Sequence, residues 1–474
     1  MQSYRIWKGS FDPRKKELVS QKKLFTDLSN ELETKQLKVS KIQDAIEKKQ
    51  ISLDKLNNVI KNNKNSLKKL KDQYPGTVIS NEFFKKSHSE RQKSAPWLDN
   101  VTAGLRNEVF EAAMELHKAF VDCAAKPIRH NMNVLMDCFG MRSLGSDEKD
   151  ALIPDLWSTL FLLVPVISTT FASVSRMFKK IGPEAFGWLL IDEAGQALPQ
   201  AAVGALIRTK RAIIVGDPMQ IEPVVVLPKQ LTETICRQFG VDPVIYNAPE
   251  ASVQTLADSA TKYYATFETT DGERQVGVPL LVHRRCTDPM FRISNSIAYD
   301  DMMVQAKIDK SSDIRDILGP SCWFHIEGQG EDKWCQKEGQ KILSLLQELK
   351  EHNVKPDLYI VTPFFVVQDQ MRKMLIESNL LADWVTDSDP RRWVYEHVGT
   401  VHTVQGREAE AVFFILGAPN AEQTGARNWA GGRPNLLNVA ATRAKEALYV
   451  IGNRKLWKKA GVFQTLDKYM DAQN

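Results

Sequence analysis

A hydrophobic residue recurs at every seventh position in the first part of the chain. These positions are Leu18, Phe25, Leu32, Val39, Ile46, Leu53, Ile60 and Leu67. Three residues after them, apolar and polar residues alternate, in the order Gln21, Leu28, Lys35, Ile42, Lys49, Leu56, Asn63 and Leu70. No proline or glycine interrupts the stretch between Pro13 and Pro75. The pattern predicts one long helix of the coiled-coil type over residues 18–70, which ends at QYPGT (residues 73–77).

An apolar seam of this length requires another helix to cover it. The sequence contains no second heptad run of comparable length. The partner is therefore a second copy of the chain, the shorter helices after residue 100, or a helix outside this sequence.

The pattern changes along the rest of the chain. We expect a loop over residues 78–97 and helix over residues 98–140, where apolar residues are spaced by three and four. From residue 161 onwards, short apolar runs are separated by helix-length stretches, which is typical of a buried parallel sheet with crossover helices. The runs are FLLVPVIST (161–169), GWLLIDEA (187–194), RAIIVGD (211–217), DLYIVTP (357–363), VGTVHTVQG (398–406), AVFFILGAP (411–419) and ALYVIGN (447–453).

These patterns predict an α/β protein with two parallel-sheet lobes after a long helix. Residues 226–276, between the two sets of apolar runs, are polar and irregular with some helix. We expect four regions: a basic coiled-coil stalk (1–75), a helical connecting region (76–160), a first lobe (161–276) and a second lobe (277–474).

Charge and cysteine content narrow the class of protein. Residues 1–73 hold 18 Lys and Arg against 9 Asp and Glu, whereas the whole chain of 474 residues carries a net charge of +5, so the remainder is slightly acidic. A basic arm on such a body is suited to nucleic acid, although a solvated basic helix is also common. The six cysteines show no CxxC spacing, which argues against structural zinc. With no apolar segment long enough to span a bilayer, we expect a soluble cytoplasmic protein.

Two adjacent carboxylates, Asp192 and Glu193, follow the apolar run of GWLLIDEA. At a strand end, an Asp can hold Mg²⁺ and a neighbouring Glu can deprotonate a water that attacks a phosphate. The stretch IDEAGQA, which contains both, resembles motif II (Walker B) of the superfamily 1 helicases, in the branch of the nonsense-mediated-decay and related RNA and DNA helicases.

Other stretches resemble further motifs of the same helicases, in the same order along residues 166–453. They are VISTTFAS (166–173, motif Ic), VGDPMQIEPVV (215–225, motif III), VPLLVHRRCTDPMFRISNSIAYDDMM (278–303, motif IV), YIVTPF (359–364, motif IVa), VGTVHTVQGREAEAVFFIL (398–416, motif V) and NLLNVAATRAKEALYVIGN (435–453, motif VI).

The resemblance implies two RecA-like lobes that hydrolyse ATP with Mg²⁺ in the cleft between them and move 5′ to 3′ along single-stranded DNA or RNA. It implies that Glu193 is the catalytic base, Asp192 the magnesium ligand and Gln220 the sensor of the γ-phosphate. The arginines that reach the phosphates are then Arg284 and Arg443. The remaining implied contacts are Gly406 and Glu408 with the nucleotide, and Thr169, Thr170, Thr362, Pro363, Thr400, His402 and Thr403 with the nucleic acid.

Three positions depart from the family pattern. His283 stands where an aromatic residue usually precedes the motif IV arginine, and Arg285 adjoins Arg284. Glu222 occupies a position that is small or apolar in many relatives. The stretch TPFFVVQ has one more residue than usual before Gln368, which makes its contact with nucleic acid an open alternative.

The phosphate loop that Asp192 and Glu193 would need, GxxxxGK[ST], is absent. The nearest glycine-bearing stretches are WKGSFDP (7–13) and FGMRSLGSD (139–147). In the family this loop precedes motif II, with a helical stalk inserted between them. We therefore expect an incomplete first lobe and a helicase C-terminal portion that is inactive alone, its coiled coil pairing with an N-terminal helicase fragment or a second copy. The alternatives are a partner subunit that donates the loop, or a catalytically silent module that binds nucleic acid or protein.

Overall fold

The computed structural model describes residues 2–73, 79, 81–140, 145–248, 250–269, 272–308, 310–385, 389–404 and 406–473. The chain divides into two compact units. One unit contains residues 1–87 and 94–109, and the other contains residues 88–93 and 110–474. Both predicted lobes therefore belong to the second unit. The four predicted regions have no other test here and stay predictions.

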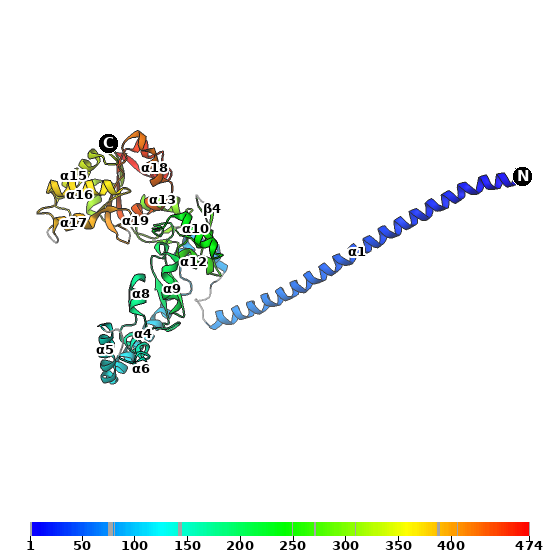
Figure 1. Cartoon of the computed structure of the whole chain (residues 1–474), viewed down its shortest axis with the longest axis horizontal. Helices are drawn as coiled ribbons and strands as arrows, with labels where there is room; N and C mark the ends of the chain where they lie inside the picture. Colours follow the sequence, from blue (N-terminus) through cyan, green and yellow to red (C-terminus); the bar gives the residue numbers. More distant parts are fainter. Residues whose placement is uncertain are drawn as a thin grey trace. The chain divides into compact units, whose positions relative to one another are not determined.

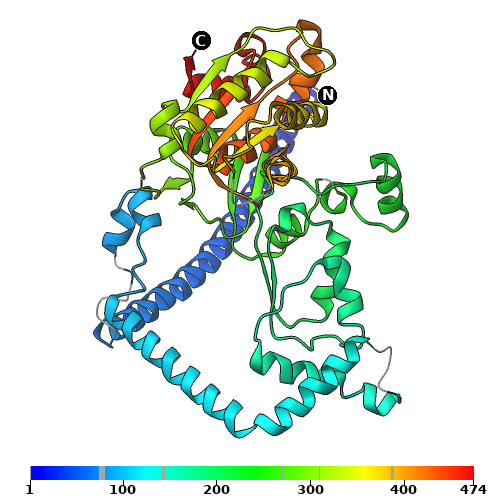
Figure 2. The ribbon, with the colours of Figure 1, turned by 90° about the vertical axis from the view of Figure 1, so that its left-hand side faces the viewer.

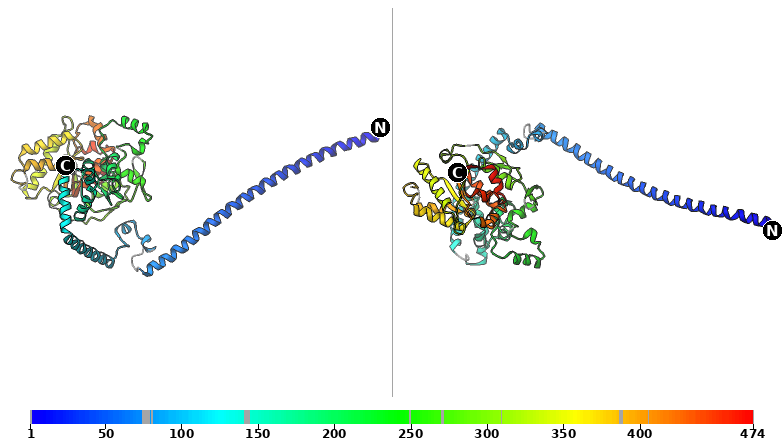
Figure 3. Two further views of the ribbon diagram at one scale, coloured as in Figure 1. Left: turned by 60° about the horizontal axis from the view of Figure 1, so that its bottom comes forward. Right: turned by 90° about the horizontal axis from the view of Figure 1, so that it is seen from above.

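The first unit contains the predicted long helix, α1 (Gln2–Gln73). It is a single uninterrupted helix of 72 residues that begins well before the heptads (Figures 1 and 3). Its heptad positions are exposed; Phe25, for example, is 74% exposed and Leu67 is 41% exposed. The helix is confirmed, whereas its pairing in a coiled coil stays a prediction. Of the predicted QYPGT terminator, residues 74–77 lie outside the described residues.

Two short helices replace the loop predicted at residues 78–97: α2 (Asn81–Lys85) and α3 (His88–Lys93). Each has an acidic residue in its first turn and a basic residue in its last, which favours the helix dipole. The prediction of helix over 98–140 is confirmed by α4 (Asn100–Cys123) and α5 (Ala125–Gly140). Among the described residues, no helix is both long enough and apolar enough to cross a bilayer.

The strand predicted at 161–169 is wrong. Its first residues finish the helix α7 (Ile153–Leu163), which follows the short α6 (Asp147–Asp150), and the segment then extends irregularly to α8 (Phe171–Met177). Pro165 explains the end of α7, because a residue before proline is driven out of the helical region, and Val164 adopts φ −126°. Without strand neighbours, Val166 is 75% exposed.

The first lobe contains the two predicted strands β1 (Leu189–Ile191) and β2 (Ala212–Ile214). They pair in parallel, with the crossover formed by the 3₁₀ turn η1 (Ala194–Gln196) and the helix α9 (Pro199–Ile207). The helix expected within 226–276 is present as α10 (Lys229–Gln238), α11 (Pro243–Tyr246) and α12 (Val253–Ala260). A hairpin of β3 (Ala265–Thr269) and β4 (Gly272–Val276) was not predicted, although the Asp-Gly at 271–272 is a hairpin signal.

The second lobe, at the top of Figure 2, contains a parallel sheet with helices around it. The sheet has six strands in the order β12-β7-β11-β10-β8-β9. The strands are β7 (Cys322–His325), β8 (Leu358–Thr362), β9 (Val398–Thr400), β10 (Ala409–Ile415), β11 (Ala444–Gly452) and β12 (Asp471–Gln473). All four apolar runs predicted as strands of this lobe are confirmed. A separate parallel pair, β5 (Val282–His283) and β6 (Val304–Gln305), precedes the sheet.

Helices cover both faces of the sheet, so the central strands carry apolar residues on both faces. The helices are α13 (Met290–Ala298), α14 (Asp313–Leu318), α15 (Gln336–Glu351), α16 (Phe365–Ser378), α17 (Pro390–His397), α18 (Thr424–Gly431) after the 3₁₀ turn η2 (Ala421–Gln423), α19 (Asn435–Arg443), α20 (Arg454–Trp457) and α21 (Phe463–Tyr469). Both α15 and α19 contact β10 and β11. Because neither face meets water, every residue of Val412–Ile415 is buried and apolar, as expected for a central parallel strand.

A carboxyl group is enclosed in this core. Glu338, in the first turn of α15, is 0% exposed. Its Oε2 accepts a hydrogen bond from the Gly417 amide at 2.8 Å, while its Oε1 has no partner. Burial raises the pKa of Glu338 from 4.5 to about 8. The side chain is therefore a neutral acid in the folded protein at pH 7.

We predict that Glu338→Gln stabilises the protein at alkaline pH. Between pH 4.5 and about 8 the folded state keeps a proton that the unfolded state has lost, so the free energy of unfolding falls as the pH rises. A glutamine keeps the acceptor for Gly417 and does not ionise. Thermal unfolding should show a melting temperature raised by on the order of 5 °C at pH 8, with a smaller difference at pH 5. The exposed Glu348→Gln, on the same helix, should show no such pH dependence; equal shifts in both variants contradict the assignment.

Candidate functional site

The acidic pair occupies a strained turn at the carboxyl end of β1. Glu193 has a left-handed backbone with φ 53°, which is uncommon for a residue with a side chain. Its amide donates to Asp192 Oδ1 at 2.9 Å, and Gln196 Nε2 donates to Glu193 Oε2 at 2.9 Å. Asp192 is exposed and Glu193 is half-buried. Strain of this kind is typical of functional positions.

The loops that follow β1 and β2 are in direct backbone contact. The Ala194 amide donates to the Val215 carbonyl at 3.0 Å. A Cβ on Gly216 would lie 2.6 Å from the Gly195 nitrogen, and one on Gly195 would lie 2.9 Å from the Asp217 carbonyl oxygen. Only glycine allows this approach. The two predicted motifs II and III are thereby held as one unit.

The second of these loops fixes the orientation of Gln220. Asp217 Oδ1 accepts from the Met219 amide at 2.9 Å, and the Gln220 amide donates to the Asp217 carbonyl at 3.1 Å. Gln220 Nε2 donates to Asp217 Oδ2 at 3.1 Å. Because the side-chain nitrogen of Gln220 is bonded to Asp217, its side-chain oxygen can accept a hydrogen bond from a donor in the second lobe.

That donor is Arg443, the last residue of α19. Its Nη2 donates to Gln220 Oε1 at 2.9 Å and its Nη1 donates to the Arg407 carbonyl at 3.0 Å. Arg443 is 1% exposed, and its Nε–H has no hydrogen-bond partner. Burial lowers the pKa of Arg443, as does the charge of Arg285, whereas Glu193 and Glu408 raise it. A buried cation with an unused donor suits an anion.

Three more charged groups stand beside Arg443. Glu408 pairs with Lys445 at 2.9 Å and with Arg285 at 3.0 Å. The hydrogen bond from Lys445 lowers the pKa of Glu408, with further lowering by the charges of Lys445, Arg285 and Arg443. In the described part of the chain, Arg284 is exposed and forms no ion pair. The structure thus brings Arg285, rather than the predicted Arg284, to this cluster, and the role of Arg284 stays a prediction.

His283 supports the turn that carries the two arginines. Its Nε2 accepts from the Cys286 amide at 3.1 Å and lies 2.8 Å from Cys286 Sγ. Burial, aided by the charge of Arg285, lowers the pKa of His283 to about 4, so the ring is neutral at pH 7. The ring packs against Phe291 with centroids 5.5 Å apart. The histidine at the aromatic position of the family pattern is therefore a packing residue here.

The structure separates the residues predicted to contact nucleic acid into exposed and buried sets. Thr169 and Thr170 are exposed at the start of α8. Thr362 is 1% exposed, accepts from the Phe364 amide at 3.3 Å through its hydroxyl, and precedes the buried Pro363. In this conformation Thr362 and Pro363 shape the end of β8 and do not reach the surface.

The turn after β9 is more accessible. His402 and Thr403 are exposed, and Thr403 Oγ1 donates to the Thr400 carbonyl at 2.9 Å. The Thr400 amide donates to Oε1 of Gln368, which is 2% exposed. Gly406 has φ +78° in open space. Gln368 is thus a buried support of the Thr400–Thr403 turn, which favours that alternative over direct contact with nucleic acid.

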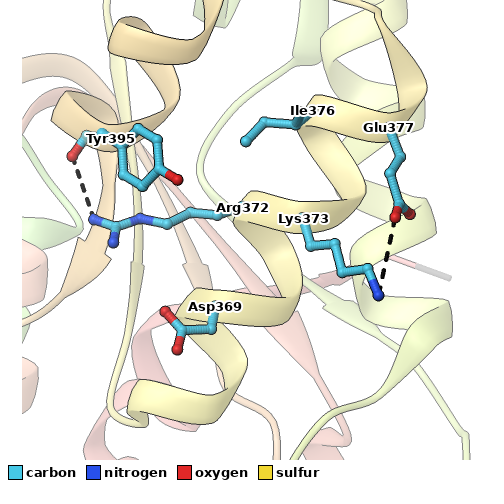
Figure 4. Close-up of a pocket in the computed structure, with 6 residues that line it drawn as sticks. All are labelled: Asp369, Arg372, Lys373, Ile376, Glu377 and Tyr395. Atoms are coloured by element: carbon cyan, nitrogen blue, oxygen red, sulfur yellow. Dashed lines mark hydrogen bonds and ion pairs between the residues drawn. The ribbon is translucent and has the colours of Figure 1, made fainter.

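A shallow hollow of about 370 Å³ lies beside this support, between α16 and α17 (Figure 4). The side chain of Arg372 crosses it, with its guanidinium 5.1 Å from the centre of the Tyr395 ring. Arg372 Nη2 and Nε donate to the Val398 carbonyl at 2.7 and 3.0 Å. Gln368 and Arg372 of one helix therefore hold both ends of β9.

Three side chains of the second lobe that the sequence did not single out contact the first lobe: Tyr299, Asn438 and Arg433. Tyr299 Oη hydrogen-bonds to Asp217 Oδ2, and Asn438 Nδ2 donates to the Met219 carbonyl at 2.9 Å. Arg433 forms an ion pair with Glu222. The one signal for these residues was a polar side chain, Asn438, within the apolar stretch NLLNVAA, and its partners are 139 and 219 residues away in sequence.

No group of three or more His, Cys, Asp or Glu side chains converges on a metal position within the described ranges. Magnesium bound with a nucleotide needs only one or two protein carboxylates, because phosphates and water supply the other ligands. The exposed carboxylate of Asp192 fits that requirement.

The chain is similar in sequence to two protein-family models and to known helicases. One family model, described as an AAA domain, matches residues 2–227, and a second, also described as an AAA domain, matches residues 265–455. An ATP-dependent helicase of Methanocaldococcus jannaschii is 23% identical over 302 residues, which cover 60% of this chain and 39% of that protein. The ATP-dependent helicase upf1 of Schizosaccharomyces pombe is 24% identical over 289 residues, which cover 59% and 28%.

The chain spans less than half of the length of these relatives. Among solved structures, the arterivirus nonstructural protein 10 helicase in complex with DNA covers 58% of this chain at 11% identity, with a TM-score of 0.28. The assignment of the chain to a protein family therefore rests on the sequence matches.

We predict that Gly216→Ala destabilises the contact between the two loops. Its Cβ would meet the backbone nitrogens of Gly195 and Ala194 at 2.6 and 2.7 Å, and backbone cannot swing away as a side chain can. The expected loss is about 1–3 kcal/mol in the free energy of unfolding, measured by denaturant titration. Gly187→Ala, in the same lobe and with no atom within 4 Å of the new Cβ, is the matched control. An equal effect of both substitutions would show that the close approach is unimportant.

Proposed function

Since the chain belongs to the superfamily 1 helicases, in the branch of the Upf1 and DNA2 helicases, we propose that it forms the ATP-hydrolysing and strand-translocating part of such an enzyme. The single observation that carries the proposal is the set of charges around Arg443. The charge of Glu193, in the first lobe, influences the pKa of Arg443, and so do the charges of Arg285 and Glu408 in the second lobe. An acidic pair on one lobe and arginines on the other are what phosphoryl transfer between two lobes requires.

The role of each residue follows from its surroundings. Asp192, exposed at the strand end, would hold Mg²⁺, which would neutralise charge on the phosphates. Glu193 accepts a proton from water, with its carboxylate oriented by Gln196. Arg443 donates its unpaired Nε–H to phosphate oxygen, and Arg285 adds a second guanidinium on the same side. Gln220 couples the two lobes through the hydrogen bond that its side-chain oxygen accepts from Arg443.

The first lobe requires additional strands for this function. Leu190 on β1 is 68% exposed and Ile213 on β2 is 46% exposed, although parallel strands are normally covered on both faces. We propose that strands bearing a phosphate loop pack here, supplied by an N-terminal helicase segment whose helix also covers the α1 seam, or by a partner subunit. A second copy covering that seam is the remaining possibility.

The nucleic-acid surface includes the turn Thr400–Thr403 and the start of α8. The exposed His402, Thr403, Thr169 and Thr170 present donors and acceptors that do not select a base. Single-stranded DNA or RNA is then gripped through its backbone, with a salt-sensitive affinity. The polarity we expect is 5′ to 3′, and the expected location is the cytoplasm.

A second candidate function is a binding module without catalysis. The observation that favours it is the exposed apolar face of β1 and β2, together with the lack of a GxxxxGK[ST] pattern in the sequence. Such a module would bind a strand or a partner protein through the second lobe and the α1 seam, without turnover.

We predict strand-stimulated ATP hydrolysis when the chain is combined with an N-terminal helicase segment that bears a phosphate loop, and little without it. Glu193→Gln should reduce turnover at least 100-fold while retaining nucleotide binding, because it removes only the base. Arg443→Ala should reduce turnover by a similar factor. Turnover would be measured by phosphate release with oligo(dT) or poly(U). The exposed Glu184→Gln, in the same lobe, is the control.

Full activity of Glu193→Gln would exclude this residue as the base. Absence of turnover in every combination, with retained strand binding, would favour the binding module.

We further predict that Gln368→Leu weakens strand binding severalfold. It leaves the Thr400 amide without its acceptor, so the Thr400–Thr403 turn loses its fixed position. Fluorescence anisotropy with labelled oligo(dT) or poly(U) would measure the dissociation constant. The exposed Gln347→Leu is the matched control; unchanged binding in Gln368→Leu would show that the turn does not contact the strand.

A further inference from the structure

A directed chain of hydrogen bonds runs from one lobe to the other and back. Ser294 Oγ donates to Asn438 Oδ1 at 2.6 Å, and Asn438 Nδ2 donates to Tyr299 Oη at 2.9 Å. Tyr299 in turn donates to Asp217 Oδ2, the atom that also accepts from Gln220 Nε2 at 3.1 Å. The Gln220 oxygen then accepts from Arg443 at 2.9 Å.

The direction of each bond in this chain is fixed by its neighbours. Asp217 is bonded only by donors, because Tyr299, Gln220 and the Met219 amide all point hydrogens at its carboxylate. Burial and the charge of Asp217 hold the pKa of Tyr299 well above its usual value, so the phenol keeps the proton that it donates. Gln220 can satisfy both Asp217 and Arg443 in one of its two amide orientations only, with nitrogen toward Asp217 and oxygen toward Arg443.

The residues of this series of hydrogen bonds connect the separate parts of the site. Asn438 is 0% exposed and Ser294 is 2% exposed, so this end is anchored in the second-lobe core. Asn438 and Arg443 begin and end one six-residue stretch of α19, and Asn438 also bonds the Met219 carbonyl at 2.9 Å. Tyr299 directly follows α13, and Arg285 lies in the turn that precedes the same helix. The Asp217–Gln220 turn is the one element from the first lobe.

We propose that Tyr299 is a positioning residue for Gln220: through Asp217, it holds the amide in the orientation that meets Arg443 whenever the two lobes are docked. The proposal rests on the function proposed above, since it assigns Gln220 a task at the phosphate. Tyr299 touches neither nucleotide nor strand in this role. It makes the direction of the Gln220 amide depend on the second lobe, so that the sensor is set before the nucleotide arrives.

A measurement that needs no catalysis tests the geometric part. Hydrogen–deuterium exchange on the full chain should show that Tyr299→Phe speeds exchange in peptides spanning residues 214–222 about tenfold, because the Met219 and Gln220 amides bond to Asp217. Peptides from β10 and β11 should exchange at the same rate in Tyr299→Phe as in the wild-type protein, which would show that the second lobe is folded. Tyr263→Phe, which removes an exposed hydroxyl of the first lobe, should leave residues 214–222 unaltered. Unaltered exchange there in Tyr299→Phe overturns the proposal.

A double-mutant cycle tests whether Tyr299 acts through Gln220. In the complete ATPase, Tyr299→Phe should lower kcat about tenfold and leave KM nearly unchanged. In a Gln220→Ala background it should have no further effect. An equal tenfold loss in that background shows an independent, general structural role and overturns the proposal. If no ATP is hydrolysed, the proposed ATPase function fails, while the exchange measurement still decides whether Tyr299 orders the turn.

Discussion

The buried guanidinium of Arg443 is the constraint around which the site is organised. A permanent charge withdrawn from water must be compensated by hydrogen bonds and opposite charges. Gln220 and the Arg407 carbonyl satisfy two of its nitrogens, and Glu193 and Glu408 supply negative charge nearby. These groups come from both lobes, so the arginine can be stable where it is only when the lobes are docked. The third nitrogen, Nε, has no hydrogen-bond partner and is left for a ligand. The docked arrangement of the lobes that stabilises Arg443 therefore also leaves it able to bind an anion.

The two lobes differ in how far they satisfy their own packing requirements. In the second lobe, the central strands β10 and β11 are buried on both faces, and one hydrophobic core cluster includes residues from β7 to α21. In the first lobe, a two-stranded sheet shows large apolar side chains to solvent. The loops of the first lobe are nevertheless well defined, because glycine contacts and the Asp217 carboxylate fix them locally. These loops thus depend less on their own sheet than on each other and on the second lobe.

Sequence patterns predicted the elements whose cause is local. The heptads of α1 and the apolar runs of β8, β10 and β11 depend on periodicity and burial, and both were recognised. The run at 161–169 was misread, since an apolar stretch ends a helix as readily as it forms a strand, and Pro165 was the better guide. For the site, the resemblance to the helicase motifs predicted functional roles for Glu193, Gln220 and Arg443, and these roles stay predictions. The resemblance did not locate Arg285 or Tyr299, because which of two arginines turns inward, and which tyrosine meets Asp217, depends on contacts that form only in the folded chain.

The support of β9 by α16 has a consequence for assembly. β9 is an edge strand, and its outward-facing polar groups include the Val398 carbonyl and the Thr400 amide. Arg372 and Gln368 occupy these two groups with side-chain hydrogen bonds. An edge whose backbone is already bonded offers no template to another strand, so it resists edge-to-edge aggregation and domain swapping. The same two side chains that hold the turn in place thus keep this margin of the sheet from polymerising.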